Sequence, residues 1–220
     1  MVGFLGRLCL RIAGLFLFFL LIFSGAAFAV EPLLLKEDFN GEFIGLHVLH
    51  FEDKSRKLTI DDVKSPEYKV KFAPENQTTL NFGFSDSDHW LYFPVKNADS
   101  KNVRWLLQLE DPRINLAEAY EETADGGYRA HFSGGQLPVG IRDVKNRKNV
   151  FVFDTRPGTS GVFVRVVSPG KTFTNVFMTA WNEKEFTDKN VLESLLLGAF
   201  YGSMLGLLLY NFFIFLTVRD

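Results

Sequence analysis

The sequence predicts an all-β exported domain, a sandwich of two packed sheets, followed by one transmembrane α-helix. Between residues 45 and 181 the apolar stretches are short, rich in β-branched and aromatic residues, and separated by turn residues about every ten positions. A targeting segment precedes this region at the N-terminus. A long uncharged apolar stretch follows it at the C-terminus.

The N-terminal segment, residues 1–29, is expected to be a signal peptide. Arg7 and Arg11 form a positive region, residues 12–23 are apolar, and small residues stand where signal peptidase would cleave after Ala29. An uncleaved segment would remain as a second membrane helix. The one cysteine, Cys9, lies inside it, so the mature chain offers no disulfide, cysteine nucleophile or thiolate metal site.

Ten strands are expected in the exported region, and the turn chemistry between them fits two packed sheets. They are Gly45–Phe51, Tyr68–Phe72, Leu80–Phe84, Trp90–Lys96, Val103–Leu109, Leu116–Glu121, Tyr128–Phe132, Asn149–Asp154, Gly161–Ser168 and Phe173–Trp181. Residues 59–65 are expected to form one helical turn.

Alternation along two of these strands predicts which side chains face the core. Both faces of residues 90–96 are apolar, with Trp90 and Tyr92 on one and Leu91 and Phe93 on the other, so both should be covered. Pro94 lacks an N–H and argues for a strand edge or a bulge. In residues 162–167, three valines should face inward and alternate with Phe163, Arg165 and Val167.

Residues 195–218 are expected to cross a membrane. They carry no charge, and at about 1.5 Å per residue they make about 36 Å of helix against a hydrocarbon core of about 30 Å. Gly198, Gly202 and Gly206 recur every fourth residue and give one small face, which predicts close packing against other transmembrane helices. The domain boundaries expected are 30–184 for the sandwich, 185–194 for a short charged connector and 195–218 for the helix. Such a connector is too short for a free tether, so movement of the sandwich should reach the helix.

Several function classes find no support in the sequence. It contains no nucleophile elbow, zinc-protease motif, phosphate loop or dinucleotide-binding glycine pattern, so neither an enzyme nor a cofactor is expected. With a formal net charge of −2 and no basic patch, nucleic acid is not an expected partner. His47 and His50 should point to opposite faces of a strand, and His89 and His131 have no partner at a ligand spacing, so no metal site is expected.

Acidic and aromatic residues leave two further questions open. Residues 86–89 could hold calcium, but a turn closed by aspartate side chains is favoured. A ligand site should combine exposed aromatic faces with charged groups. The candidate ligand-binding residues are Asp86, Trp90, Tyr92, Arg113 and Arg142. The alternative is that the tryptophans, including Trp105 and Trp181, are core residues, and this is favoured for Trp90 and Trp181.

A set of short motifs in a fixed order carries a family resemblance. The set comprises Phe51-Glu52-Asp53, residues 58–63, Leu80-Asn81-Phe82-Gly83 with Asp86, Trp90 and Asn97, Asp125-Gly126-Gly127-Tyr128, Leu137-Pro138, residues 149–153, and Phe200-Tyr201-Gly202 through Arg219-Asp220. In these features the sequence resembles the second type of periplasmic domain of the bacterial seven-transmembrane receptors with diverse intracellular signalling modules.

The resemblance implies a jelly-roll-like sandwich that binds a small ligand, with carbohydrate as the suggested class. It also implies seven membrane helices and a cytoplasmic output module such as a histidine kinase or diguanylate cyclase. Since this sequence contains only the first such helix, we expect a receptor input truncated after that helix. We place residues 30–194 in the periplasm, the helix in the bacterial inner membrane and the C-terminus in the cytoplasm. The alternative is a single-pass anchored carbohydrate-binding or adhesion module without signalling output.

Overall fold

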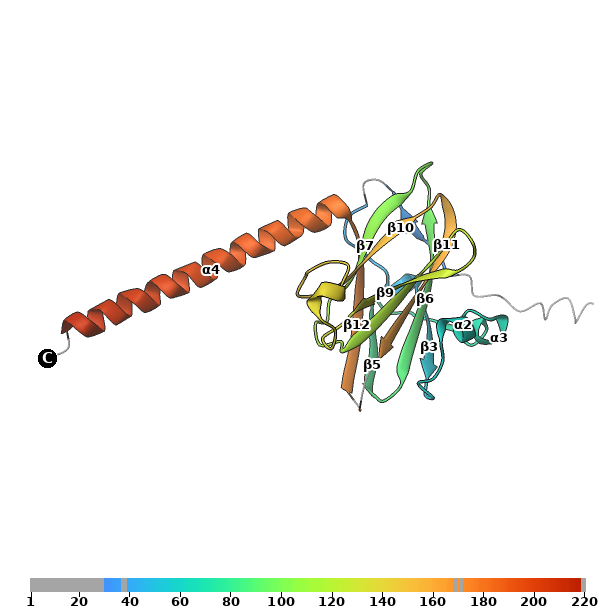
Figure 1. Cartoon of the computed structure of the whole chain (residues 1–220), viewed down its shortest axis with the longest axis horizontal. Coiled ribbons are helices and arrows are strands. Elements are labelled where there is room, and N and C mark those ends of the chain that lie inside the picture. The colour runs from blue at the N-terminus through green and yellow to red at the C-terminus, as the bar shows by residue number, and fades with distance from the viewer. Residues whose placement is uncertain (1–29, 37–38, 168–169, 171, 219–220) are drawn as a thin grey trace, which may run out of the picture.

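The computed structural model describes residues 30–36, 39–167, 170 and 172–218, and the expected signal peptide lies outside them. Within this part of the chain, two β-sheets pack face to face and a long helix, α4 (Glu183–Val218), extends from them (Figure 1). The predicted class, an all-β sandwich followed by one long apolar helix, is confirmed.

The larger sheet has seven strands within the described residues. Its main order is β4 (Ala73–Pro74), β3 (Leu49–Asp53), β6 (Asp88–Asn97), β11 (Gly158–Val167), β8 (Leu116–Glu122) and β9 (Tyr128–Ser133). Strand β1 (Leu33–Leu35) pairs in parallel with the last residues of β6. Because β3 pairs with residues 88–92 of β6 and β1 with residues 95–97, Pro94 lies between two partner strands, where its missing N–H interrupts neither pairing.

The smaller sheet is organised around its longest strand, β12 (Thr172–Asn182). The order is β10 (Asn149–Thr155), β7 (Val103–Leu109), β12 and β2 (Glu42–Phe43), and β5 (Thr79–Ser85) pairs with the first half of β12. Consecutive strands repeatedly cross between the sheets, from β5 to β6, β7 to β8, β9 to β10 and β11 to β12. This alternation gives the sandwich its jelly-roll-like topology.

The main core lies between the two sheets and is built by alternate residues of their strands. In β11 the inward residues are Val162, Val164 and Val166, as predicted, while Phe163 and Arg165 lie on the outer face. Facing them from the smaller sheet are Trp105, Leu107, Phe151, Phe153, Val176 and Met178. Inside this core the Trp105 Nε1–H donates to Thr155 Oγ1 at 2.8 Å, so the indole is buried with its polar atom satisfied.

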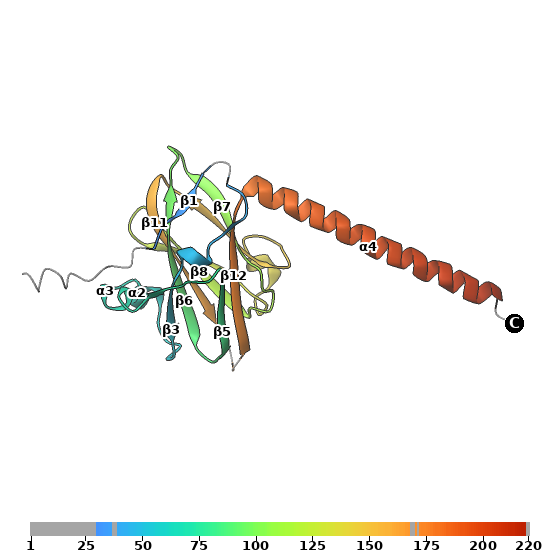
Figure 2. The same ribbon diagram turned by 180° about the vertical axis from the view of Figure 1, so that it is seen from behind.

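The outer face of the larger sheet is covered by two short helices, α2 (Ile60–Val63) and α3 (Pro66–Lys69) (Figure 2). Val63 of α2 packs on Trp90 and Phe163 in a second apolar cluster. The expected helical turn is therefore present, and it begins with a capping interaction in which the Thr59 N–H donates to Asp62 Oδ2 at 2.8 Å. The prediction that both faces of β6 are covered is confirmed.

The strand expected over Tyr68–Phe72 was wrong. Tyr68 and Lys69 belong to α3, which starts with Pro66 in its first turn, a position where proline costs no helical hydrogen bond. Tyr68 and Phe72 instead anchor the helix end, because both rings pack on Phe51. The first part of the expected strand 45–51 is also different, since Gly45–His47 form the 3-10 turn η1, which places His47 outside β3.

Helix α4 starts directly where β12 ends, so residues 185–194, expected as a connector, are helical. Phe186 is buried against Leu106 and Val150 on the outer face of the smaller sheet. Farther along the helix, Asn190 accepts from Asn146 Nδ2 at 3.0 Å and Glu193 accepts from Arg147 Nη2 at 2.8 Å. The first three turns of α4 are thus fixed to the sandwich.

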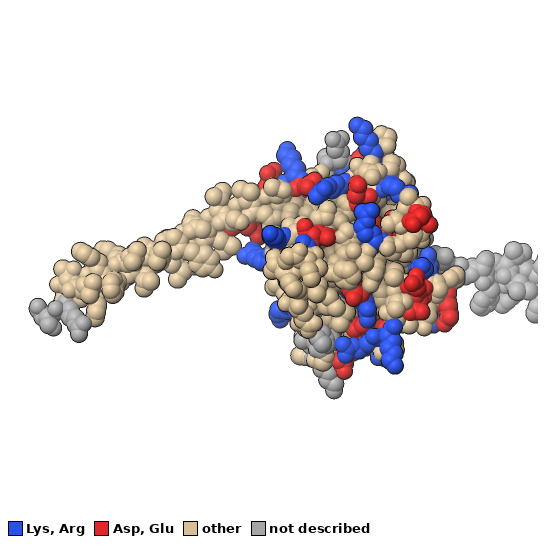
Figure 3. Space-filling view, viewed as in Figure 1, with Lys and Arg blue, Asp and Glu red and all other residues tan. Residues whose placement is uncertain are grey.

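The rest of α4 is long and apolar enough to cross a membrane. Charged side chains are spread over the sandwich and the start of α4, and the described helix shows none beyond that start (Figure 3). Its side chains from Leu195 onward are exposed in the isolated chain, as expected for a surface covered by lipid.

Replacing Gly45 by alanine should destabilise the sandwich. A Cβ atom there would lie 2.2 Å from the Thr78 carbonyl oxygen and 2.6 Å from that of Gln77, and both are backbone atoms that cannot swing away. We expect Gly45→Ala to lower the free energy of unfolding by about 1–3 kcal/mol, as overpacking usually does. Chemical denaturation measures this, and Gly140→Ala is the matched control because nothing lies within 4 Å of its Cβ. Equal stability of the two variants would contradict the packing at η1.

Candidate functional site

A cleft of about 160 Å³ opens at the end of the sandwich where β7 and β11 stop. It exists because β7 leaves β12 after Leu109 pairs with Met178 and the Glu110 N–H donates to the Phe177 carbonyl. The lining residues are Asp111, Arg113, Ile114 and Asn115 of the β7–β8 loop, Val166 and Val167 of β11, and Phe173, Thr174 and Asn175 of β12. The cleft therefore has an apolar floor and a polar rim.

One side of the rim is a fixed guanidinium–carboxylate pair. Arg113 Nε and Nη2 donate to the two oxygens of Asp111 at 3.0 and 2.8 Å, and the Arg113 N–H donates to Asp111 Oδ1 at 2.9 Å. These hydrogen bonds from Arg113 lower the pKa of the Asp111 carboxyl group below its ordinary value. A charged, oriented fork therefore stands at the mouth of the cleft.

The lining of the cleft also includes an acceptor without a partner in the part of the chain that the structure describes. Asn175 Oδ1 is buried and has no hydrogen-bond partner among the described residues. Buried polar atoms are nearly always hydrogen-bonded in proteins, so each exception calls for an explanation. Since Asn175 lines the cleft, a hydroxyl or N–H group of a bound molecule could donate to this oxygen.

Two exposed aromatic rings stand beside the cleft because of a β-bulge. Between Thr174 and Asn175 the register with β5 shifts, and Gly83 adopts a positive φ of 63° at this point. The extra residue reverses the alternation of β5, so Phe84 pairs with Phe173 on the outer face. Their rings meet edge to face at 5.4 Å and are 78% and 42% exposed, respectively.

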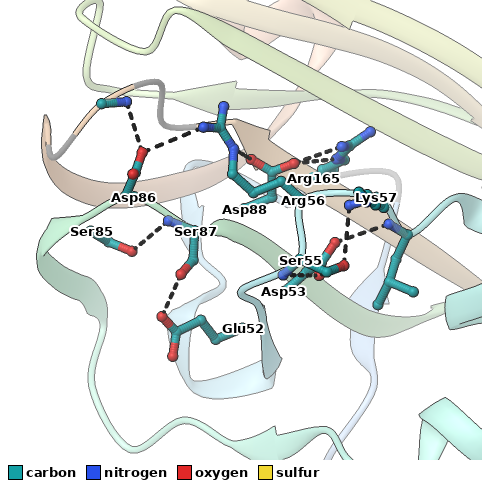
Figure 4. Close-up of polar contacts among 12 residues, drawn as sticks. Glu52, Asp53, Ser55, Arg56, Lys57, Ser85, Asp86, Ser87, Asp88 and Arg165 are labelled. Carbon is teal, nitrogen blue, oxygen red and sulfur yellow. Dashed lines mark hydrogen bonds and ion pairs between the residues drawn. The ribbon is translucent and has the colours of Figure 1, made fainter.

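A polar network on the other side of the β11–β12 connection holds three segments together (Figure 4). Asp88 is almost fully buried and accepts from Arg165 Nη2 at 2.6 Å, while its other oxygen lies 3.4 Å from Arg56 Nε. Arg56 also donates to Asp86, which accepts from the Gly170 N–H at 3.0 Å. The network joins the β3–α2 loop, the β5–β6 turn and β11.

The carboxylate of Asp53, beside this network, also accepts hydrogen bonds from the protein. Asp53 accepts from the Ser55 N–H and hydroxyl at 2.9 and 2.6 Å and from the Leu58 N–H at 3.0 Å, which closes the loop before α2 (Figure 4). Among the described residues, no group of three or more acidic, histidine or cysteine side chains is placed to hold a metal ion. The turn expected at residues 86–89 is a bend at Ser87, and its aspartates do not close it: Ser85 Oγ accepts from the Ser87 N–H at 3.1 Å, whereas Asp86 and Asp88 bond Gly170 and Arg165.

The candidate residues predicted from sequence do not form one site. Asp86 and Arg113 both border the β11–β12 connection, and Arg113 lines the cleft. Trp90 is fully buried and Tyr92 is partly buried beneath α2 and α3, so the core alternative holds for Trp90. Arg142 has a structural role, because its Nη2 donates to the Gly134 carbonyl at 2.7 Å and fixes the loop.

Sequence reasoning also missed a histidine pair. His50 of β3 and His89 of β6 lie between the sheets, with His50 Nε2 and His89 Nδ1 3.1 Å apart. The Phe82 ring stacks on both, at centroid distances of 4.4 Å from His50 and 4.0 Å from His89. Burial lowers the pKa of His50 to about 4, aided by His89, and also lowers the pKa of His89. Only the register of β3 on β6 reveals this pair.

The fold and the junction define a class of protein, a β-sandwich joined directly to a helix that is long and apolar enough to span a membrane. Residues 45–180 match the family described as 7TMR-DISM extracellular 2. This match spans more than half of the 220-residue chain, and the chain belongs to that family, whose domains are periplasmic sensor domains of receptors. A comparison with curated proteins gives no match.

The histidine pair should make stability depend on pH between about 6.5 and 4. Both folded-state pKa values lie below the ordinary 6.5, so the unfolded chain binds protons more tightly. The stability that the neutral pair contributes is fully present above pH 6.5 and is lost as pH falls toward about 4, at a cost of about 1–3 kcal/mol.

Denaturation curves at several pH values test this dependence. We expect the double variant His50→Gln, His89→Gln to lose less stability than the unmodified chain over this window. His47→Gln, outside the pair, is the control and should keep the original pH dependence. Parallel curves for all three proteins would show that the pair is not responsible.

Proposed function

We propose that this chain is the ligand-sensing input of a receptor in the bacterial inner membrane, and that a small ligand binds in the cleft beside Arg113. The observation that carries the proposal is the course of β12. Its first residues, Phe173 to Asn175, line the cleft, and its last residue, Asn182, precedes α4 directly. One strand therefore runs from the candidate site to the membrane helix.

The cleft favours a carbohydrate as the ligand class. Sugar hydroxyl groups both donate and accept, which suits the Asn175 oxygen and the Arg113–Asp111 fork together. Sugar rings also present apolar C–H faces, and Phe173 and Phe84 offer exposed aromatic surface beside the cleft. Since about 160 Å³ is below the roughly 300–1,000 Å³ typical of drug-sized pockets, the ligand is one sugar ring or the end of a chain.

Transmission depends on the fixed junction between β12 and α4. A shift of β12 on ligand binding would move Phe186 and the first turns of α4 with it, since they pack on the same sheet. The helix would carry that motion toward a cytoplasmic C-terminus. Neighbouring helices would receive this motion through residues that pack against Gly198, Gly202 and Gly206. At each of these glycines a Cβ would meet nothing within 4 Å, so the space for a neighbour is open.

Loss of the rim groups should weaken ligand binding without unfolding the protein. In calorimetric titrations of the full chain with monosaccharides, we expect Arg113→Gln and Asn175→Ala each to weaken the binding detected by tenfold or more, as loss of a charged or buried hydrogen bond of about 1.5–3 kcal/mol implies. Arg129→Gln, on exposed β9, is the control. Undiminished binding in both rim variants would place the ligand elsewhere.

The glycine face should lie against another helix in native membranes. In a Cys9→Ser chain, Gly202→Cys and Gly206→Cys should crosslink to a neighbouring transmembrane segment, because small residues allow close backbone approach. Met204→Cys, on the other side of α4, is the control and should crosslink less. If neither glycine position crosslinks, the packing step of the proposal fails.

A further inference from the structure

The β9–β10 loop, residues 134–148, lies beside the start of α4. Figures 1 and 2 both show this loop, drawn in yellow, on the side of the sandwich from which α4 extends. It is held firmly, since Arg142 donates to the Gly134 carbonyl and Asp143 accepts from the Val152 N–H at 3.0 Å. Val144 packs in the same apolar cluster as Phe186 of α4.

The loop and α4 together form an open cavity of about 320 Å³. Its lining consists of Lys145, Asn146 and Arg147 from the loop and Asn190, Glu193, Ser194 and Leu197 from α4. Glu193 is the last charged residue of the described helix, and the apolar run starts two residues later. The cavity therefore stands where α4 passes from water into hydrocarbon, in the headgroup layer of the bilayer.

The exposed side chains of this loop suit that layer. Val139 and Ile141, in the 3-10 turn η2 (Val139–Ile141), are 51% and 57% exposed. Lys145 is exposed and makes no ion pair among the described residues, and Arg147 holds Glu193 at the cavity wall. Apolar side chains next to lysine and arginine are the composition by which protein segments bind the membrane surface.

We propose that the β9–β10 loop is a membrane-surface contact of the sandwich, with Val139 and Ile141 inserted among lipid headgroups and a phospholipid phosphate bound in the cavity beside Lys145. The occupant is the same bilayer that α4 crosses, because Ser194 and Leu197 belong to both the cavity and the membrane-entry turn. Together with α4, this gives the sandwich a second fixed point on the membrane. The inference rests on α4 crossing a membrane and is independent of any ligand in the Arg113 cleft.

The test uses the full chain in lipid nanodiscs with a fluorescent label on a single cysteine. In a Cys9→Ser chain, a label at Ile141→Cys should be quenched by spin-labelled lipid headgroups and protected from aqueous iodide. Val70→Cys is the matched control, because Val70 is apolar and 82% exposed and follows α3, on the side of the sandwich away from α4 (Figure 1). Its label should respond to iodide alone.

Changing the charge of the lipid headgroups distinguishes phosphate binding beside Lys145 from simple closeness of the loop to the bilayer. Discs that contain phosphatidylglycerol should increase headgroup quenching at position 141 relative to phosphatidylcholine discs, and Lys145→Glu should remove that increase. Lys96→Glu, exposed on β6, should leave it unchanged. A label at 141 that behaves like the one at 70 overturns the proposal. So does one shielded from iodide without lipid quenching, which would indicate a covering protein chain.

Discussion

The structure depends on the direct connection between β12 and α4, which have no loop between them. Asn182 ends the strand and Glu183 begins the helix, so the backbone passes from one element to the other without a loop. Burial of Phe186 against Leu106 and Val150 then prevents the helix from swinging about this point. A sandwich attached through a flexible tether could bind a ligand without moving its anchor, whereas this one cannot be displaced independently of α4.

Both sheets of the sandwich are covered on their outer faces, the larger sheet by the short helices α2 and α3 and the smaller sheet by the start of α4. On the larger sheet, α2 and α3 bury Trp90 and Phe163. The buried Arg165–Asp88 pair joins β11 to β6, and Arg56, whose Nε lies 3.4 Å from Asp88, ties the loop before α2 to that pair. Breaking such a buried pair by removing one partner is costly, so the network fixes this insertion in one place. On the smaller sheet the covering element is the membrane helix itself. The face that a soluble sandwich would leave to water is used here for attachment.

Much of the fold could be predicted because local pattern and burial agree. Strand β7 has the bounds expected from its apolar run, and both faces of β6 are covered as the alternation indicated. Prediction failed where tertiary contacts decide. Residues 68–72 alternate like a strand but follow a proline that starts a helix, and β1 exists only because β6 has a free edge there.

The candidate site was less predictable than the fold. Arg113 was expected to bind a ligand and lines the cleft, but Asn175 and Phe173 were not singled out, because a bulge at Gly83 decides which residues of β5 and β12 face outward. No periodicity in the sequence indicates that bulge. The His50–His89 contact likewise depends on strand register, which a single sequence does not specify.

The spacing of the contacts on α4 determines which side of the helix faces the sandwich. Phe186, Asn190, Glu193 and Leu197 follow one another at intervals of three and four residues and share one side of the helix. At about 100° per residue, Gly198, Gly202 and Gly206 project from roughly the opposite side. Helix α4 thus turns one side toward its own sandwich and leaves the glycine side available to other transmembrane helices. A rotation of the sandwich by a few degrees would therefore rotate the glycine side by the same angle.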